Sequence, residues 1–108
     1  MQVQEAVYYT KLLDIYGNIL TAKQQSILTD YLCYDNTLSE IASAHNTTRQ
    51  AVKDIIDRTC AKLDELEAKL HFCQKTQKVL DNLRKLTANI TDSDTQRSIN
   101  LIIKSMEV

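Results

Sequence analysis

Apolar residues recur every three or four positions along almost the whole chain, which is the spacing of one face of an α-helix. The chain has no proline and a single glycine, so the two residues that most often interrupt helices are nearly absent. We therefore predict an all-α protein. The expected helices cover roughly residues 3–16, 21–34, 37–45, 48–72 and 94–106, and residues 75–86 keep helical spacing either as a continuation of the fourth helix or after a break near Gln74.

Local signals indicate where several of these helices begin and end. Gly17 is expected to end the first helix in the left-handed conformation that glycine adopts at many helix C-termini. Thr21 and Gln24 have the spacing of a capping box, in which each side chain bonds the backbone of the other residue. Thr37 and Glu40 repeat the same spacing. These pairs predict the starts of the second and third helices.

Residues 37–59 predict two helices joined by a tight turn, the arrangement of many DNA-reading domains. Asn46 suits the turn because asparagine tolerates the left-handed conformation. Thr48 is a suitable N-cap for the following helix, whereas Thr47 stands where the motif usually has an apolar residue. The expected fold is a helix-turn-helix bundle without a wing, with a long fourth helix and a C-terminal helical extension.

An apolar stripe with nearly heptad spacing runs along the fourth helix. Because three heptads are marginal for a coiled coil, two interpretations remain open. The stripe packs against the first and last helices of the same chain, or it forms a homodimer. We expect residues 1–60 to form the helix-turn-helix domain, and residues 61–108 to form an extension that packs on it or dimerises. The stripe consists of Val52, Ile56, Thr59, Leu63, Leu66, Leu70 and Cys73.

The start of the fourth helix carries the candidate nucleic-acid contacts. In a recognition helix, these positions face the major groove or the neighbouring phosphates. Arginine and lysine can bind guanine or phosphate, and glutamine can bind adenine. Asp54 and Asp57 on the same face would repel phosphate, so a solvated helix face with pairs four residues apart is the alternative. The candidate residues are Thr48, Arg49, Gln50, Lys53 and Arg58.

Charge is unevenly distributed along the chain. The net charge is −1, whereas a nucleic-acid-binding domain usually has a clear basic excess. Residues 1–47 have a net charge of −3, and residues 70–88 have a net charge of +3. The basic segment either extends a nucleic-acid footprint, meets an acidic partner, or is an ordinary solvated helix face. This second basic patch consists of Lys75, Lys78, Arg84 and Lys85.

The sequence contains no motif that indicates catalysis or metal binding. Cys33, Cys60 and Cys73 belong to no CxxC pair, and His71 and Cys73 would point apart on a helix, so we expect no metal, no cofactor and no enzymatic activity. We interpret the cysteines as small buried apolar residues. No apolar run approaches the roughly 20 residues needed to span a bilayer. These features predict a cytoplasmic protein without a membrane partner.

Several short segments, taken together, resemble the YlxM/p13 family of small bacterial helix-turn-helix proteins, whose N-terminal half is similar to sigma factor region four. The resemblance covers about residues 8–75. The segments are Leu20 to Gln25 (LTAKQQ), Leu38 to Ala42 (LSEIA), Thr48 to Val52 (TRQAV), Ile56 to Thr59 (IDRT) and Leu63 to Leu70.

This resemblance implies a cytoplasmic bacterial protein with a sigma region four-like helical fold. Genes of the family typically lie beside those for the signal recognition particle GTPase and its receptor, so the family is proposed to assist or regulate that pathway. The implied function is a regulatory or accessory protein of the signal recognition particle, with its GTPase or its RNA as partner. The alternative is a DNA-binding transcriptional regulator that contacts DNA through Arg49, Gln50 and Lys53.

Overall fold

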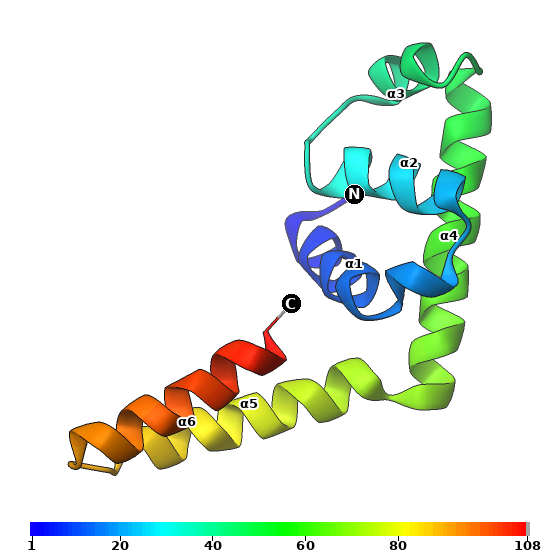
Figure 1. Cartoon of the computed structure of the whole chain (residues 1–108). Coiled ribbons are helices and arrows are strands. Elements are labelled where there is room, and N and C mark those ends of the chain that lie inside the picture. The colour runs from blue at the N-terminus through cyan, green and yellow to red at the C-terminus, as the bar shows by residue number, and fades with distance from the viewer. Residues whose placement is uncertain (108) are drawn as a thin grey trace. The chain divides into compact units, whose positions relative to one another are not determined.

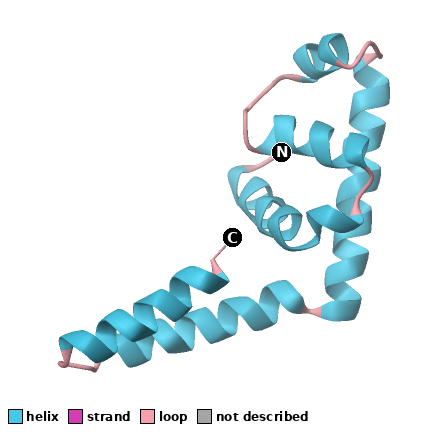
Figure 2. Cartoon of the chain, in the orientation of Figure 1, coloured by secondary structure: helices cyan, strands magenta, loops and turns pink. Residues whose placement is uncertain are grey.

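The computed structural model of the chain describes residues 1–107, and all regular structure in this range is helical (Figures 1 and 2). The prediction of an all-α helix-turn-helix protein is thus confirmed. The chain divides into two compact units, Met1–Leu70 and His71–Val108. The helices are α1 (Val3–Tyr16), the short 3-10 helix η1 (Gly17–Ile19), α2 (Ala22–Leu32), α3 (Leu38–Ala44), α4 (Arg49–Leu70), α5 (Phe72–Ala88) and α6 (Ser93–Met106).

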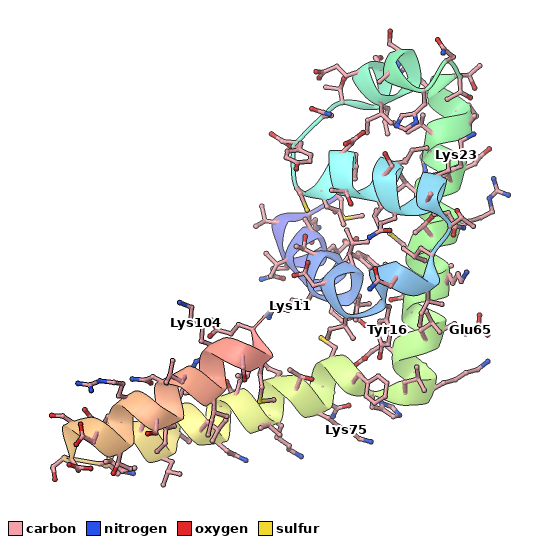
Figure 3. The ribbon with its side chains drawn as sticks, viewed as in Figure 1. Lys11, Tyr16, Lys23, Glu65, Lys75 and Lys104 are labelled. Carbon is pink, nitrogen blue, oxygen red and sulfur yellow. The ribbon has the colours of Figure 1, made fainter. Side chains whose placement is uncertain are left out.

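In the first unit, α1, α2 and α3 all pack against the long helix α4 (Figure 1). The apolar faces of these four helices meet in one core, and burying these faces stabilises the fold by removing apolar surface from water. Tyr16 extends from the end of α1 toward α4 (Figure 3), where its hydroxyl donates to Glu67 Oε1 at 2.7 Å. The buried apolar residues of this unit are Leu12, Leu13, Tyr16, Leu20, Ile27, Leu28, Ile41, Ala42, Val52, Ile56, Cys60 and Leu63.

Much of the heptad-like stripe of α4 lies in this core. Val52, Ile56, Thr59 and Leu63 are buried, and the Thr59 hydroxyl donates to the Ile55 carbonyl oxygen at 2.6 Å. These positions face α1, α2 and α3, so the first part of the stripe packs within its own unit, against α1 as expected but also against α2 and α3. Toward the end of the helix the burial fades, and Leu70 is exposed.

The first helix ends differently from our expectation. Gly17 has a φ of −54°, so it is right-handed and begins the 3-10 helix η1. The prediction of a left-handed cap was therefore wrong. A Cβ atom at Gly17 would lie 3.3 Å from Gln25 Nε2. Because Gln25 Nε2 is the tip of a flexible side chain, a larger residue at Gly17 would require only a small shift of Gln25.

The question of where the long fourth helix ends is decided at His71. This residue has a φ of 57°, in the left-handed region, so α4 ends at Leu70 and α5 begins at Phe72. The left-handed residue breaks the helix because it turns the backbone away from the hydrogen-bonding direction of the preceding turn. The helix is thus slightly shorter than the expected 48–72, and the break lies just before Gln74.

The second unit is a hairpin of two antiparallel helices, α5 and α6 (Figure 1). Asp92 caps α6, as its carboxylate accepts from the Thr95 backbone N–H at 2.9 Å. The same contacts with Thr95 hold the pKa of Asp92 below its usual range. Leu80 of α5 and Ile103 of α6 are the buried apolar residues among the described part of this unit. The hairpin therefore leaves most of its apolar side chains at least partly exposed.

Candidate nucleic-acid interface

The turn of the helix-turn-helix is built by hydrogen bonds at both of its ends. Thr37 and Glu40 form the predicted capping box, with the Thr37 hydroxyl accepting from the Glu40 backbone N–H at 3.1 Å. Asn46 has a φ of 52°, as its place in the turn predicts. The Thr48 hydroxyl then accepts from the Ala51 backbone N–H at 3.1 Å and caps α4.

A side-chain contact also holds the turn against α2. His45 Nε2 lies 3.5 Å from Asp30 Oδ2, and both side chains are mostly buried. This contact fixes the turn on the helix that precedes the motif. It involves two residues fifteen positions apart, so no local spacing in the sequence could have revealed it.

All five candidate residues at the start of α4 are exposed, but most of their polar groups are already engaged. Gln50 Nε2 donates to Asp54 Oδ1 at 3.0 Å, and Lys53 Nζ donates to Asp57 Oδ2 at 2.9 Å. The contact with Asp57 raises the pKa of Lys53. The two carboxylates, which we expected to repel phosphate, thus also occupy the donors that would bind it.

The remaining candidates differ in which of their polar groups already make a hydrogen bond. Arg58 Nε donates to the backbone carbonyl oxygen of Asp54 at 3.3 Å. Within the described part of the chain, Arg49 makes no side-chain hydrogen bond or ion pair. The Thr48 hydroxyl oxygen accepts the hydrogen bond that caps α4, although the hydroxyl can still donate one. Arg49 is therefore the candidate on this face whose whole guanidinium group is available, and Arg58 keeps both of its Nη groups available.

Sequence patterns did not reveal a shallow groove beside Lys53. The groove has a volume of about 250 Å³, and Met1, Tyr31 and Leu38 line it together with Lys53 and Asp57. It therefore joins the N-terminus, α2, α3 and α4, which are distant in sequence. Tyr31 continues the apolar spacing of Ile27 and Leu28 along α2, and only the packing of the helices shows that it borders an opening.

The second basic patch is divided between two sides of α5. Lys75, Lys78 and Lys85 lie on its exposed side, and none of them has an ion pair or side-chain hydrogen bond to another described residue. Figure 3 shows Lys75 extending from the side of α5 that faces away from α6. Arg84 lies elsewhere, with Nη2 at 2.7 Å from Glu107 Oε1. Three unpaired lysines therefore form the available part of this patch, which we call the lysine face.

The cysteines differ from the interpretation as buried apolar residues. Cys60 is buried, and burial raises the pKa of its thiol to about 11. Cys73 is partly buried, and Cys33 is exposed, so for Cys33 the interpretation was wrong. The described residues contain no group of three or more histidine, cysteine or acidic side chains that could hold a metal ion. None of their helices is long and apolar enough to cross a membrane.

Comparison with known proteins identifies the family. Residues 3–102 match the family UPF0122, described as "Putative helix-turn-helix protein, YlxM / p13 like". A UPF0122 protein of Bacillus pumilus is 35% identical over 107 residues, covering 99% of this chain and 97% of the relative. A UPF0122 protein of Fusobacterium nucleatum is 36% identical over 106 residues, covering 98% and 99% of the two chains.

The protein UPF0122 YlxM of Bacillus subtilis is 34% identical over 107 residues, covering 99% of this chain and 97% of the relative. No solved structure matches the chain. The family match extends beyond residue 75, where the resemblance noted in the sequence ended, and includes most of the α5–α6 hairpin. The chain therefore belongs to the YlxM/p13-like helix-turn-helix family.

Proposed function

We propose that the protein is a regulatory or accessory protein of the bacterial signal recognition particle pathway, that it acts in the cytoplasm, and that it binds the RNA of the particle. The pathway comes from the family, whose genes lie beside those of the particle. The observation that favours RNA over operator DNA is the contrast between two basic surfaces. The donors of Gln50 and Lys53 are engaged by carboxylates of α4, whereas Lys75, Lys78 and Lys85 are unpaired.

The spacing of the lysine face suits contact with a phosphate backbone. Lys75, Lys78 and Lys85 lie at intervals of three and seven residues, so they share one side of α5 and span about 15 Å along it. Unpaired lysines gain affinity for nucleic acid by releasing the counterions of phosphates, and this gain needs no base sequence. Structured RNA is recognised mostly through its shape and backbone, as such a surface allows.

A DNA-binding transcriptional regulator is the second candidate, and Arg49 is the observation that favours it. This arginine is exposed and unpaired within the described chain, and it stands at the start of a capped recognition helix. That position is where helix-turn-helix proteins contact base edges. In this case Lys53 would have to exchange its contact with Asp57 for one with a phosphate.

A protein partner, the GTPase of the particle, is the third candidate.

A gel-shift series at several salt concentrations, with particle RNA and with duplex DNA, distinguishes these candidates. We expect RNA binding whose salt dependence decreases in the triple variant K75A/K78A/K85A, by a slope of about 2 to 3 if each lysine neutralises one phosphate. The double variant R49A/K53A should change RNA affinity little. K11A/K69A is the matched control because it removes exposed lysines from α1 and from the far end of α4.

Each other outcome assigns the function differently. Tight duplex binding that R49A/K53A abolishes, with RNA binding absent, would establish the transcriptional regulator instead. If neither nucleic acid shifts at low salt, nucleic-acid binding is refuted. The GTPase would then be tested by direct titration with the purified protein.

A further inference from the structure

An asparagine interrupts the row of lysines on the exposed side of α5. Asn82 lies four residues after Lys78 and three residues before Lys85, and side chains at these spacings are neighbours on a helix surface. Lys75 lies three residues before Lys78 and extends the row toward the start of the helix, on the side that faces away from α6 (Figure 3). The row therefore places an uncharged amide between the lysines of the lysine face.

The amide of Asn82 is available to a ligand. Its side chain is exposed and makes no hydrogen bond to another described residue. Asp81 is the carboxylate nearest to the row, and it accepts from Gln77 Nε2 at 3.0 Å and lies 3.8 Å from Arg84 Nη1. Because Asp81 is directed toward these two residues, it leaves both Asn82 and the lysine face unoccupied.

The side chains of the row differ in length and in chemistry. A lysine carries an ammonium group at the end of a long flexible stem and can only donate hydrogen bonds, which suits the oxygens of a phosphate. The short side chain of asparagine both donates and accepts. A ribose 2′-hydroxyl also donates and accepts, so an amide can satisfy both of its functions. The row thus has phosphate-binding groups on both sides of a group that suits a sugar hydroxyl.

This order of groups matches the minor groove of double-stranded RNA. That groove is wide and shallow, and it displays the 2′-hydroxyls between the phosphates of the two strands. Lys78 and Lys85 are about 10 Å apart along the helix axis, so their long side chains can reach phosphates while the short side chain of Asn82 faces the groove between them. The minor groove of B-form DNA is only about 6 Å wide, and its sugars lack the hydroxyl.

One end of the row borders a hollow in the surface of the hairpin. Lys75 and Lys78 line this hollow together with His71 and Gln74, and its volume is about 280 Å³. No carboxylate is among the lining residues, so the hollow has both the room and the charge for a phosphate group. We therefore expect this end of the row to contact one strand of the RNA and Lys85 to contact the other.

We propose that Asn82 distinguishes RNA from DNA by binding a ribose 2′-hydroxyl in the minor groove of an RNA stem, while the lysine face binds the phosphates on either side. This inference rests on the proposed RNA binding. It specifies that the protein recognises a double-stranded stem by its groove and its sugars, and not by its base sequence. Asn82 sets the preference for RNA, whereas the lysines supply affinity for any phosphate backbone.

A similar spacing on α6 provides a matched control. Asn100 lies three residues after Arg97 and four residues before Lys104, and it is exposed like Asn82. In this case Arg97 Nη1 lies 3.7 Å from Asp94 Oδ1, so a carboxylate engages one of the two cations. The row on α6 therefore offers less to a phosphate backbone than the row on α5, and we expect Asn100 to make no contact with RNA.

Titration of the full chain with three hairpins of one sequence tests the proposal, with fluorescence anisotropy as the readout. The hairpins are RNA, DNA and RNA with 2′-fluoro sugars, which keeps the A-form helix and the phosphates but has no hydroxyl to donate. The wild type should prefer RNA over 2′-fluoro RNA about fivefold, as one hydrogen bond between uncharged groups accounts for. N82A should bind these two hairpins equally and should prefer RNA over DNA less than the wild type does. N100A should keep both wild-type preferences.

The salt dependence separates the role of Asn82 from that of the lysine face. N82A should leave the salt dependence of RNA binding unchanged, because asparagine neutralises no phosphate. K75A/K78A/K85A should reduce the salt dependence with all three hairpins and keep the preference for RNA over 2′-fluoro RNA. Circular dichroism should show the same helical content in N82A and N100A as in the wild type.

The results that would overturn the inference differ from those that refute RNA binding. If N82A keeps the wild-type preference for RNA over 2′-fluoro RNA, or N100A loses it to the same extent, Asn82 does not bind the hydroxyl, and RNA binding by the lysine face still stands. A wild type that binds the two hairpins equally has the same consequence. If the wild type binds no RNA, or K75A/K78A/K85A binds it unchanged, the proposed function fails and the inference fails with it.

Discussion

Both units of this protein are built from amphipathic helices, but the first unit buries the apolar side of its helices and the second leaves much of it exposed. The unit Met1–Leu70 contains twelve of the fourteen buried apolar residues, whereas His71–Val108 contains Leu80 and Ile103 among its described residues. The net charges also differ, at −3 for the first unit and +2 for the second. The first unit is built around α4 and satisfies its own core. The second displays apolar and basic surface, so we expect stability to come mainly from the first and binding mainly from the second.

The largest expected effect is the loss of Leu63 from the core of the first unit. Leu63 is completely buried in α4, so L63A should lower the free energy of unfolding of that unit by about 2 to 5 kcal/mol. Urea denaturation followed by circular dichroism should show the hairpin unfolding in an earlier, separate transition. L80A should shift only the earlier transition. L101A, at an exposed site, should change the free energy of unfolding of either unit by less than about 0.5 kcal/mol.

A single transition that L63A and L80A shift equally would contradict this division. It would mean that the two units unfold as one cooperative body, so the sparse core of the hairpin would not set its stability. The boundary near residue 60 that the sequence suggested could be tested in the same way, by expressing residues 1–60 and residues 1–70. We expect the shorter fragment to be less stable because it lacks Leu63.

Much of the helix-turn-helix could be predicted from the sequence because its signals are local. The capping boxes at Thr21 and Thr37 and the turn at Asn46 each depend on residues within four positions of one another, and the structure contains all three. The break at His71 could not be predicted in the same way. Histidine adopts the left-handed conformation less readily than glycine, and the apolar periodicity continues through the break.

The candidate site was predictable in its residues but not in its contacts. The spacing of Gln50 to Asp54 and of Lys53 to Asp57 permits pairing on a helix, but a spacing does not decide whether a side chain binds a neighbour, water or a ligand. The position of Arg84 on α5 was also visible, but its partner Glu107 lies at the C-cap of α6. That contact depends on how α5 and α6 pack, which local patterns do not specify.

The second prediction concerns the pH dependence of the first unit. Burial, with smaller contributions from nearby carboxylates, raises the pKa of Cys60 from 9.0 to about 11. The thiol ionises more easily in the unfolded chain, so its contribution to stability is complete below pH 9 and is lost as the pH rises from 9 to 11. The loss should be at most about 3 kcal/mol.

Urea denaturation at several pH values, comparing the wild type with C60A, measures how much the ionisation of Cys60 contributes to the pH dependence of stability. The variant should lose less stability than the wild type between pH 9 and 11, although the lost side-chain volume lowers its stability at pH 7. Parallel pH profiles for the two proteins would show that Cys60 ionises equally in the folded and unfolded states. The exposed Cys33 should react quickly with a thiol reagent at pH 8 in both proteins.

The third prediction concerns the capping box of α3. T37A removes the hydroxyl that accepts from the Glu40 backbone N–H, so it should destabilise the first unit by about 1 kcal/mol. Substitution by serine should retain most of the stability because serine keeps the hydroxyl. Hydrogen exchange should show faster opening of α3 in T37A and unchanged rates in the α5–α6 hairpin. Equal acceleration in both units would again argue that they are coupled.

The smallest expected effect is at His71, the left-handed residue between α4 and α5. H71G should be neutral or stabilising by a few tenths of a kcal/mol, because glycine adopts this conformation without strain but loses more entropy on folding. H71A should change the stability by less than about 0.5 kcal/mol, because histidine and alanine both carry the Cβ atom that disfavours the left-handed conformation. Urea denaturation of the three proteins measures both differences. A stabilising H71A would instead indicate that α4 and α5 join into one continuous helix, which alanine favours, and the division between a self-contained unit and an interacting hairpin would then lose its structural boundary.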